Sequence, residues 1–176
     1  MNKSKQIKVK DSLKFLTDIS KIFRKNIDTK VIAITGSCGK TTLKELLGNT
    51  LKKISKVSIS PKSYNNKYGV PLSLFNLTNK DNFGVLEVGM DKKGEIDYLT
   101  KIIQPDVSVI TNVNYAHAKN FKNIKQIALA KSEIINNTKS GGIVILNADD
   151  KFFKLHKKIA FKNNLKIISF GIKNPK

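Results

Sequence analysis

Short apolar runs alternate along this chain with segments in which apolar residues recur every three or four positions. The runs predict strands, because strands buried on both faces read as continuous apolar stretches, and the recurring positions predict helices with one buried face. Strands are expected at residues 31–35, 57–60, 83–88, 107–111, 143–146 and 167–170, and helices at 41–53, 71–77, 95–103, 124–136 and 152–162. This alternation predicts an α/β fold with a doubly wound, mostly parallel sheet.

One more helix is expected before the first strand. Apolar residues recur at helical spacing from Leu13 to Phe23, and Ser12 stands before them as the expected N-cap. No internal repeat or low-complexity linker divides the chain, and its 176 residues are enough for one domain with a substantial core. The sequence therefore predicts one globular unit.

The composition predicts a cytoplasmic protein with no membrane partner. Hydrophobic residues make up 40% of the chain, but no apolar run approaches the ~18 residues that span a bilayer. The basic N-terminus is not followed by the apolar segment of a secretion signal. Cys38 is the one cysteine, so the chain cannot form an internal disulfide, which fits a reducing compartment.

The formal net charge of +20 raises the possibility of a nucleic-acid partner. However, every basic residue except Arg24 is a lysine, and the lysines are scattered along the chain. Nucleic-acid surfaces tend to gather arginine and aromatic residues in patches. The sequence therefore favours a solvated basic surface without a nucleic-acid partner, and a P-loop protein whose lysines bind nucleic acid is kept as an alternative.

The first strand is followed at once by a glycine turn and a helix. In such sheets ligands bind beyond the carboxyl ends of the strands, and a glycine turn at a helix N-terminus can hold phosphate groups. Lys40 would contact the β- and γ-phosphates, and the Thr41 hydroxyl would reach Mg²⁺. The general P-loop pattern has a glycine where Ile34 stands, so this is a shorter variant. The alternative is a tight turn with a surface lysine. The predicted phosphate cradle consists of Gly36, Ser37, Cys38, Gly39, Lys40, Thr41 and Thr42.

Glu87 lies in the otherwise apolar stretch "FGVLEVG". A buried carboxylate is paired, protonated or bound to a metal, because an isolated buried charge is too costly. Its position at a strand end favours a Mg²⁺ ligand over a salt-bridged core glutamate.

Lys131 lies on the apolar stripe of its predicted helix, four residues after Ile127 and three before Ile134. Its stem could lie on apolar surface with the ammonium in water. Alternatively, burial could lower the pKa of Lys131, so that a neutral amine takes up carbon dioxide as a carbamate. Spacing leaves both possibilities open.

His117 follows the fourth strand in a loop, where a single histidine indicates little without its context.

Six stretches, in order, resemble the central domain of the Mur ligases, the ATP-dependent amide-forming enzymes of peptidoglycan synthesis. They are "ITGSCGKTTLKELL", "NNKYGVPLSL", "VLEVGMDKKGEIDYL", "PDVSVITNVNYAHAKNF", "IALAKSEI" and "GGIVILNADD". The first three look most like the member that adds D-alanyl-D-alanine to UDP-N-acetylmuramoyl-tripeptide. Another Mur ligase or a folylpolyglutamate synthase-like ligase is the alternative. The resemblance implies a sheet of the P-loop type.

The resemblance also implies roles for individual residues. The loop from Gly36 to Thr42 would hold the ATP phosphates, with Asn112 beside the nucleotide and Asn147 against adenine. Thr41, Glu87 and His117 would bind Mg²⁺, and Lys131 would be the carbamylated lysine that helps to position it. Asn65 and Asn66 would lie near the UDP-N-acetylmuramoyl-peptide, although Ser63 stands where many relatives carry another asparagine.

The implied reaction transfers the ATP γ-phosphoryl group to the tripeptide carboxylate, and the amine of D-alanyl-D-alanine then attacks the acyl phosphate. Residues 1–30 resemble the end of a UDP-sugar domain, and residues 31–176 resemble the ATP-binding domain without its C-terminal part. We therefore expect a fragment, a split-gene product or a truncated chain that binds Mg·ATP but forms no amide bond without the flanking domains. A non-catalytic nucleotide-binding remnant is the alternative, and the presence of Lys40, Glu87, His117 and Lys131 together favours the ligase.

Overall fold

The computed structural model describes residues 7–115 and 120–173, so the predicted site residue His117 lies outside the described part of the chain. Helices and strands alternate after an N-terminal helix. In chain order they are α1 (Ser12–Lys25), β1 (Lys30–Thr35), α2 (Lys40–Leu51), β2 (Val57–Ile59), α3 (Gly69–Phe75), β3 (Phe83–Glu87), α4 (Glu95–Ile103), β4 (Val107–Ile110), α5 (Ile124–Lys131), α6 (Glu133–Asn136), β5 (Ile143–Asn147), α7 (Phe153–Lys162) and β6 (Lys166–Phe170).

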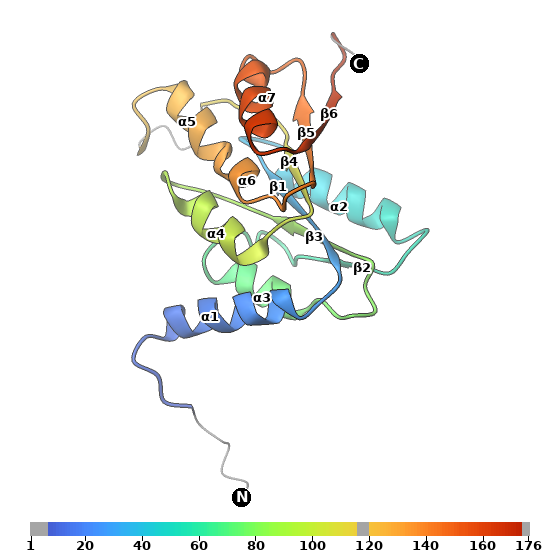
Figure 1. Ribbon diagram of the computed structural model, residues 1–176, viewed down its shortest axis with the longest axis vertical. Helices are drawn as coiled ribbons and strands as arrows, with labels where there is room; N and C mark the ends of the chain where they lie inside the picture. Colours follow the sequence, from blue (N-terminus) through green and yellow to red (C-terminus); the bar gives the residue numbers. More distant parts are fainter. Residues whose placement is uncertain (1–6, 116–119, 174–176) are drawn as a thin grey trace, which may run out of the picture.

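The six strands form one sheet in the order β2-β3-β1-β4-β5-β6, and every pair is parallel (Figure 1). The predicted α/β architecture is confirmed, with a sheet that is parallel throughout. From β1 the chain first builds β2 and β3 on one side and then β4 to β6 on the other. The loop after β1 therefore lies at the point where the strand order reverses, between the ends of β3 and β4, and such switch points bind ligands in open α/β sheets.

Two hydrophobic clusters hold the helices against the sheet. The larger lies between the sheet and the helices α3 to α7, with Phe23 of α1 packed at its edge. The smaller lies under α2 and includes Ile32, Ile34, Val85 and Val109. Helix α1 packs against α3 and α4, and α2 packs against β1, β2 and β3. The sheet thus carries most of its helices on one face and α2 on the other (Figure 1).

Besides shifts of one or two residues in the ends of several elements, two local details differ from the sequence-based expectations. Asp11 caps α1 instead of Ser12, because its carboxylate accepts a hydrogen bond from the Lys14 amide at 2.9 Å. The helix expected over residues 124–136 is two helices, α5 and α6, which separate at Ser132. The Ser132 hydroxyl donates to the Leu129 carbonyl at 2.7 Å, and such side-chain bonds compete with the helix ladder.

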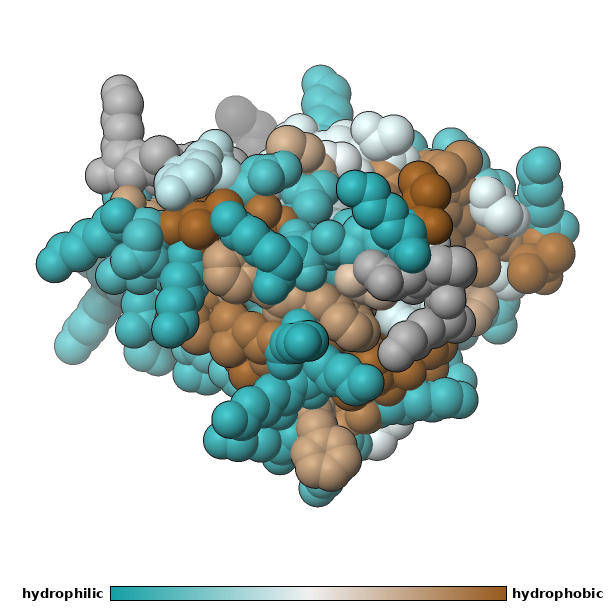
Figure 2. Space-filling model, turned by 90° about the horizontal axis from the view of Figure 1, so that it is seen from above, coloured by the Kyte–Doolittle hydropathy of each residue, from teal (hydrophilic) through white to brown (hydrophobic). Residues whose placement is uncertain are grey.

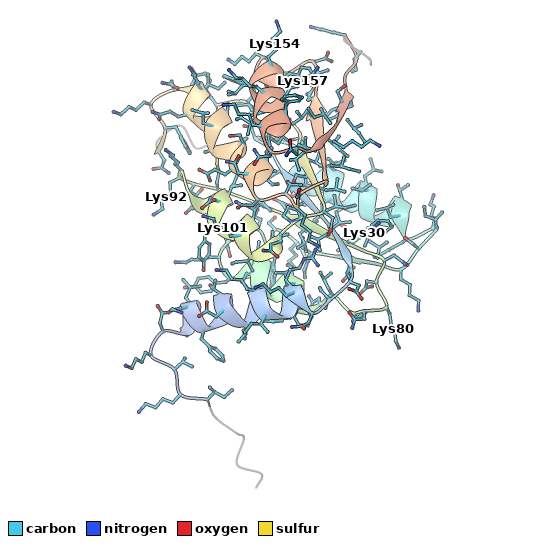
Figure 3. The ribbon with its side chains drawn as sticks, viewed as in Figure 1. Lys30, Lys80, Lys92, Lys101, Lys154 and Lys157 are labelled. Atoms are coloured by element: carbon cyan, nitrogen blue, oxygen red, sulfur yellow. The ribbon has the colours of Figure 1, made fainter. Side chains whose placement is uncertain are left out.

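The surface is rich in lysine. Figure 2 shows hydrophilic side chains over most of one end of the molecule, with hydrophobic surface exposed between them. The lysines labelled in Figure 3 project from different sides of the protein instead of gathering on one face. Within residues 7–115 and 120–173, no helix is both long and apolar enough to cross a bilayer.

Candidate active site

The glycine loop after β1 is shaped by Gly36 and Gly39. A Cβ atom on Gly36 would lie 1.8 Å from the Thr111 hydroxyl oxygen, so β1 and β4 can approach at this point because Gly36 has no side chain. Gly39 precedes α2 with a φ of 78°, a left-handed conformation that favours glycine. The two glycines thus allow the tight turn from strand to helix that the sequence predicted.

Residues after β4 brace this loop. The Cys38 amide donates to Oδ1 of Asn112 at 3.1 Å, and the Thr111 hydroxyl donates to the Cys38 carbonyl at 2.7 Å. The Asn114 amide donates to the Ser37 hydroxyl at 2.8 Å. Asn112, predicted beside the nucleotide, therefore holds the loop in place in this structure.

The start of α2 has the properties of an anion site. The amides of Lys40, Thr41 and Thr42 lie in the first turn, where backbone N–H groups have no partner within the helix and the dipole favours negative charge. The Lys40 ammonium folds back over the loop and donates to the Gly36 carbonyl at 3.1 Å. Below the loop, the Thr35 hydroxyl is buried without a hydrogen-bond partner among the described residues. A lysine held over free amides favours phosphate binding over a simple surface turn.

Glu87 lies at the end of β3 with 2% of its surface exposed. Its Oε2 accepts a hydrogen bond from the Thr41 hydroxyl at 2.7 Å, and its Oε1 accepts one from the Asn65 side-chain amide at 2.8 Å. No lysine or arginine in the described ranges forms an ion pair with this carboxylate. Within residues 7–115 and 120–173, Glu87 is therefore held by neutral donors beside the loop from Gly36 to Thr42, with no salt bridge.

Lys131 ends α5 with 2% of its surface exposed, so its ammonium does not extend into bulk water. Burial and, to a smaller extent, the positive charge of Lys40 together lower the pKa of Lys131 to about 7. No hydrogen bond joins its ammonium to a described residue. Of the two possibilities left open by its spacing, the structure contains the buried lysine.

A cavity of about 720 Å³ opens beside these residues. Lys40, Asn65 and Lys131 line the end next to the phosphate loop, and Leu13 of α1 and Tyr98 of α4 line the far side. Tyr98 also hydrogen-bonds the Thr17 hydroxyl of α1. The N-terminal helix thus forms part of the cavity wall, and the cavity has room for a ligand that extends away from the nucleotide.

The other predicted asparagines have structural contacts. Oδ1 of Asn66 accepts bonds from the amides of Tyr68 and Gly69, both at 3.0 Å, at the start of α3. The side-chain amide of Asn147 donates to the Thr111 carbonyl at 3.1 Å. Asn66 still lines the cavity, whereas the Asn147 amide already has a protein partner.

Sequence reasoning missed Lys44, which is 0% exposed. Its ammonium donates to the Ser60 carbonyl at 2.8 Å and to the Lys62 carbonyl, and pairs with Glu45 at 3.1 Å. Lys44 therefore ties α2 to the segment that leads from β2 to Asn65. Its position three residues after Thr41 places both on one side of the helix, but in a lysine-rich chain this spacing does not single it out.

Comparison with known proteins identifies the family. Residues 34–176 match the sequence profile described as the Mur ligase middle domain. The chain belongs to the Mur ligase family. A relative named UDP-N-acetylmuramoyl-tripeptide–D-alanyl-D-alanine ligase, from Buchnera aphidicola subsp. Acyrthosiphon pisum, is 40% identical over 153 residues. That match covers 87% of this chain and 33% of the relative, so the chain spans about a third of the length of the curated Mur ligases that it matches.

Solved structures of Mur ligases have the same fold. MurF from Acinetobacter baumannii superimposes with a TM-score of 0.89 and 37% identity, over 94% of this chain and 36% of the other. MurF from Thermotoga maritima, solved in complex with ADP, superimposes with a TM-score of 0.85 and 33% identity, over 99% of this chain and 40% of the other. The residues from β1 to β6 therefore form the Mur ligase middle-domain sheet.

The donors of this Mur ligase site suit Mg²⁺ and a triphosphate. Mg²⁺ prefers oxygen ligands and usually binds through one or two carboxylates together with substrate phosphates. The Thr41 hydroxyl and the Glu87 carboxylate supply such oxygens next to the free amides of α2. Within the described ranges, no group of three or more His, Cys, Asp or Glu residues could hold a metal by itself.

Proposed function

We propose that this chain is the ATP-binding part of a Mur ligase that joins D-alanyl-D-alanine to UDP-N-acetylmuramoyl-tripeptide. The names of its relatives support these substrates, and the chain covers about a third of those relatives. The site supports ATP as the phosphoryl donor, because the first turn of α2 offers free amides and Lys40 lies beside them.

One observation carries this proposal: the chain of hydrogen bonds from Thr41 through Glu87 to Asn65. It connects the start of α2, where phosphates would bind, to the wall of the cavity, where the acceptor would bind. Phosphoryl transfer depends on positioning and on neutralising charge more than on covalent help from the protein. A site that connects its phosphate loop to its acceptor cavity provides that positioning.

The proposed reaction has two steps. An oxygen of the tripeptide carboxylate attacks the γ-phosphorus, the bond to the β-phosphate oxygen breaks, and ADP leaves. The D-alanyl-D-alanine amine then attacks the acyl carbon, inorganic phosphate leaves, and the nitrogen loses a proton as the amide forms. Lys40 would hold the γ-phosphoryl group, while the cavity beside Asn65 and Lys131 would hold the acceptor.

Thr41 and Glu87 would hold Mg²⁺, together with His117 and with Lys131 as a carbamate. When bound, the metal would neutralise charge on the phosphate oxygens. To become a ligand, the neutral Lys131 amine would attack carbon dioxide and lose a proton, which replaces a buried cation with an anion. Its burial supports this step, because a buried ammonium is costly to keep charged.

Product formation tests the proposal. Residues 34–176 of this chain would replace the matching part of Acinetobacter baumannii MurF, and the chimera would be assayed with ATP, D-alanyl-D-alanine and UDP-N-acetylmuramoyl-tripeptide. We expect ADP and the new amide in equal amounts. A folded chimera that binds ATP but forms no amide would contradict the ligase function and favour a non-catalytic nucleotide-binding domain.

A further inference from the structure

A carboxylate from α6 holds the start of α4. Gly94 is the N-cap of α4, and it has no side chain that could accept hydrogen bonds from the amides of the first turn. Oε1 of Glu133 accepts a bond from the Gly94 amide at 3.0 Å, and Oε2 accepts one from the Asp97 amide at 3.0 Å. These are the two amides that a capping box satisfies from within its own helix. Glu133, which lies 39 positions after Gly94, therefore supplies the cap that α4 lacks.

This cap fixes one wall of the cavity. The segment from Gly89 to Gly94 leads from β3 to α4, and every residue in it lines the cavity. At its start, the Gly89 amide donates to the Asn65 carbonyl at 2.8 Å. At its end, the Gly94 amide donates to Glu133. The wall is thus tied at both ends, and one of the two ties is the Glu133 carboxylate.

The same short stretch of chain carries Lys131. Lys131 ends α5, and Glu133 begins α6 just after Ser132. Side chains two positions apart in a helical backbone do not face the same way, so Lys131 lines the cavity while Glu133 reaches α4. Helices α4 and α6 pack against each other (Figure 1). Residues 131–133 therefore hold the end of the cavity beside Lys40 and its opposite wall in one fixed arrangement.

We propose that Glu133 is a positioning residue for the acceptor in the cavity, an inference that rests on the proposed function. Glu133 does not line the cavity as the described residues define it, so it acts through the amides of Gly94 and Asp97. It keeps the wall from Gly89 to Gly94 in place relative to Lys131, and the acceptor lies between them. Such positioning matters because a misplacement of about 1 Å can cost on the order of a hundredfold in rate.

Nucleotide binding does not need this cap. The loop from Gly36 to Thr42 is braced by residues after β4, through bonds that Thr111, Asn112 and Asn114 make with it. None of these bonds involves α4 or α6. Loss of the cap should therefore weaken the acceptor and spare Mg·ATP, whereas a general loss of structure would weaken both.

Ligand-observed NMR with the 176-residue chain tests the proposal by measuring dissociation constants for UDP-N-acetylmuramoyl-tripeptide and for Mg·ATP. Glu133→Gln keeps the shape of the side chain but replaces one accepting oxygen with a group that only donates. We expect the acceptor to bind at least about tenfold more weakly and Mg·ATP to stay within about twofold. Hydrogen exchange of the Gly94 and Asp97 amides should become faster.

Asp81→Asn is the matched control. The Asp81 carboxylate also accepts a bond from a backbone amide, that of Thr78 at 2.8 Å, but it does so in the turn before β3, at the other end of that strand from the cavity. Both variants lose one negative charge and one accepting oxygen, and Asp81→Asn should leave both dissociation constants unchanged. Thermal unfolding checks that both variants fold. Glu133→Asp replaces Glu133→Gln if that variant does not fold, because the shorter side chain cannot reach both amides.

Three results would overturn the proposal. Unchanged acceptor affinity in Glu133→Gln would leave Glu133 as a helix cap with no part in binding. Equal weakening of the acceptor and Mg·ATP, or an equal effect of Asp81→Asn, would show a general loss of structure. Failure of the acceptor to bind the unmodified chain, with Mg·ATP still bound, would remove the acceptor from this cavity and would count against the proposed function as well.

Discussion

The Thr41 hydroxyl donates a hydrogen bond to Oε2 of Glu87 across 2.7 Å, which joins the first turn of α2 to the end of β3. These residues lie 46 positions apart in the chain. They meet because β3 lies beside β1, with Glu87 in register with Ile34. Two side-chain oxygens of the kind that bind Mg²⁺ are therefore already together at the start of α2.

Glu87→Gln tests this pair. The amide keeps the shape of the side chain but removes the negative charge that would attract Mg²⁺. We expect the gain in ATP affinity on adding Mg²⁺, compared with EDTA, to fall at least about tenfold, which is about 1.4 kcal/mol. Isothermal titration calorimetry measures both affinities.

The control for that variant is Asp28→Asn, because Asp28 is exposed and the change in charge is the same. It should leave the Mg²⁺ effect unchanged. An undiminished Mg²⁺ effect in Glu87→Gln would remove Glu87 from the metal site.

Lys44→Met tests the link between α2 and the segment that leads to Asn65. Methionine fills the space of the stem but leaves the Ser60 and Lys62 carbonyls without their donor. An unsatisfied buried polar group costs about 1–3 kcal/mol, so we expect a loss of that size in the free energy of unfolding, measured in urea. Hydrogen exchange in residues 60–66 should also become faster.

Lys52→Met is the matched control, because Lys52 is exposed at the end of the same helix. Its free energy of unfolding should stay close to that of the unmodified chain. A similar loss in both variants would show that Lys44 has no special part in holding the segment.

Lys131 makes stability depend on pH. The unfolded chain keeps this proton up to a pKa of about 10.4, whereas the folded chain releases it near pH 7, because burial lowers the pKa to about 7. Between these values the unfolded state binds more protons, so the free energy of unfolding should rise with pH, by up to about 1.4 kcal/mol per unit.

Urea unfolding from pH 7 to pH 10 in buffer free of carbon dioxide measures this slope. Lys131→Met should flatten it, whereas Lys125→Met, at an exposed position on the same helix, should not. Equal slopes in Lys131→Met and the unmodified chain would contradict a folded-state pKa near 7.

Much of the fold could be predicted from the sequence because the signals were local. All six strands were found, since continuous apolar runs are the direct pattern of strands buried on both faces. The cap of α1 was misplaced by one residue because Asp11 and Ser12 are both good caps and the sequence does not show which side chain reaches the amide. The break at Ser132 was missed because the apolar stripe continues across it.

The sequence indicated which residues belong to the candidate site, but it did not indicate what their side chains contact. Glu87 stood out because a carboxylate is out of place in an apolar run, and the structure shows what satisfies it. The spacing of Lys131 could not separate burial from exposure, because that depends on packing around the end of α5. Lys44 could not be found, since its partners are carbonyls, which have no pattern in the sequence.

Calorimetric titration of the 176-residue chain and its Lys40→Ala variant with Mg·ATP tests the central claim most directly. Lys40 lies over the phosphate loop, and the amides of α2 cannot by themselves neutralise a triphosphate. Binding should be measurable in the unmodified chain and at least about tenfold weaker in Lys40→Ala, a loss of about 1.4 kcal/mol. Equal affinity in the two proteins would contradict the account, because the loop after β1 would then not be the phosphate site.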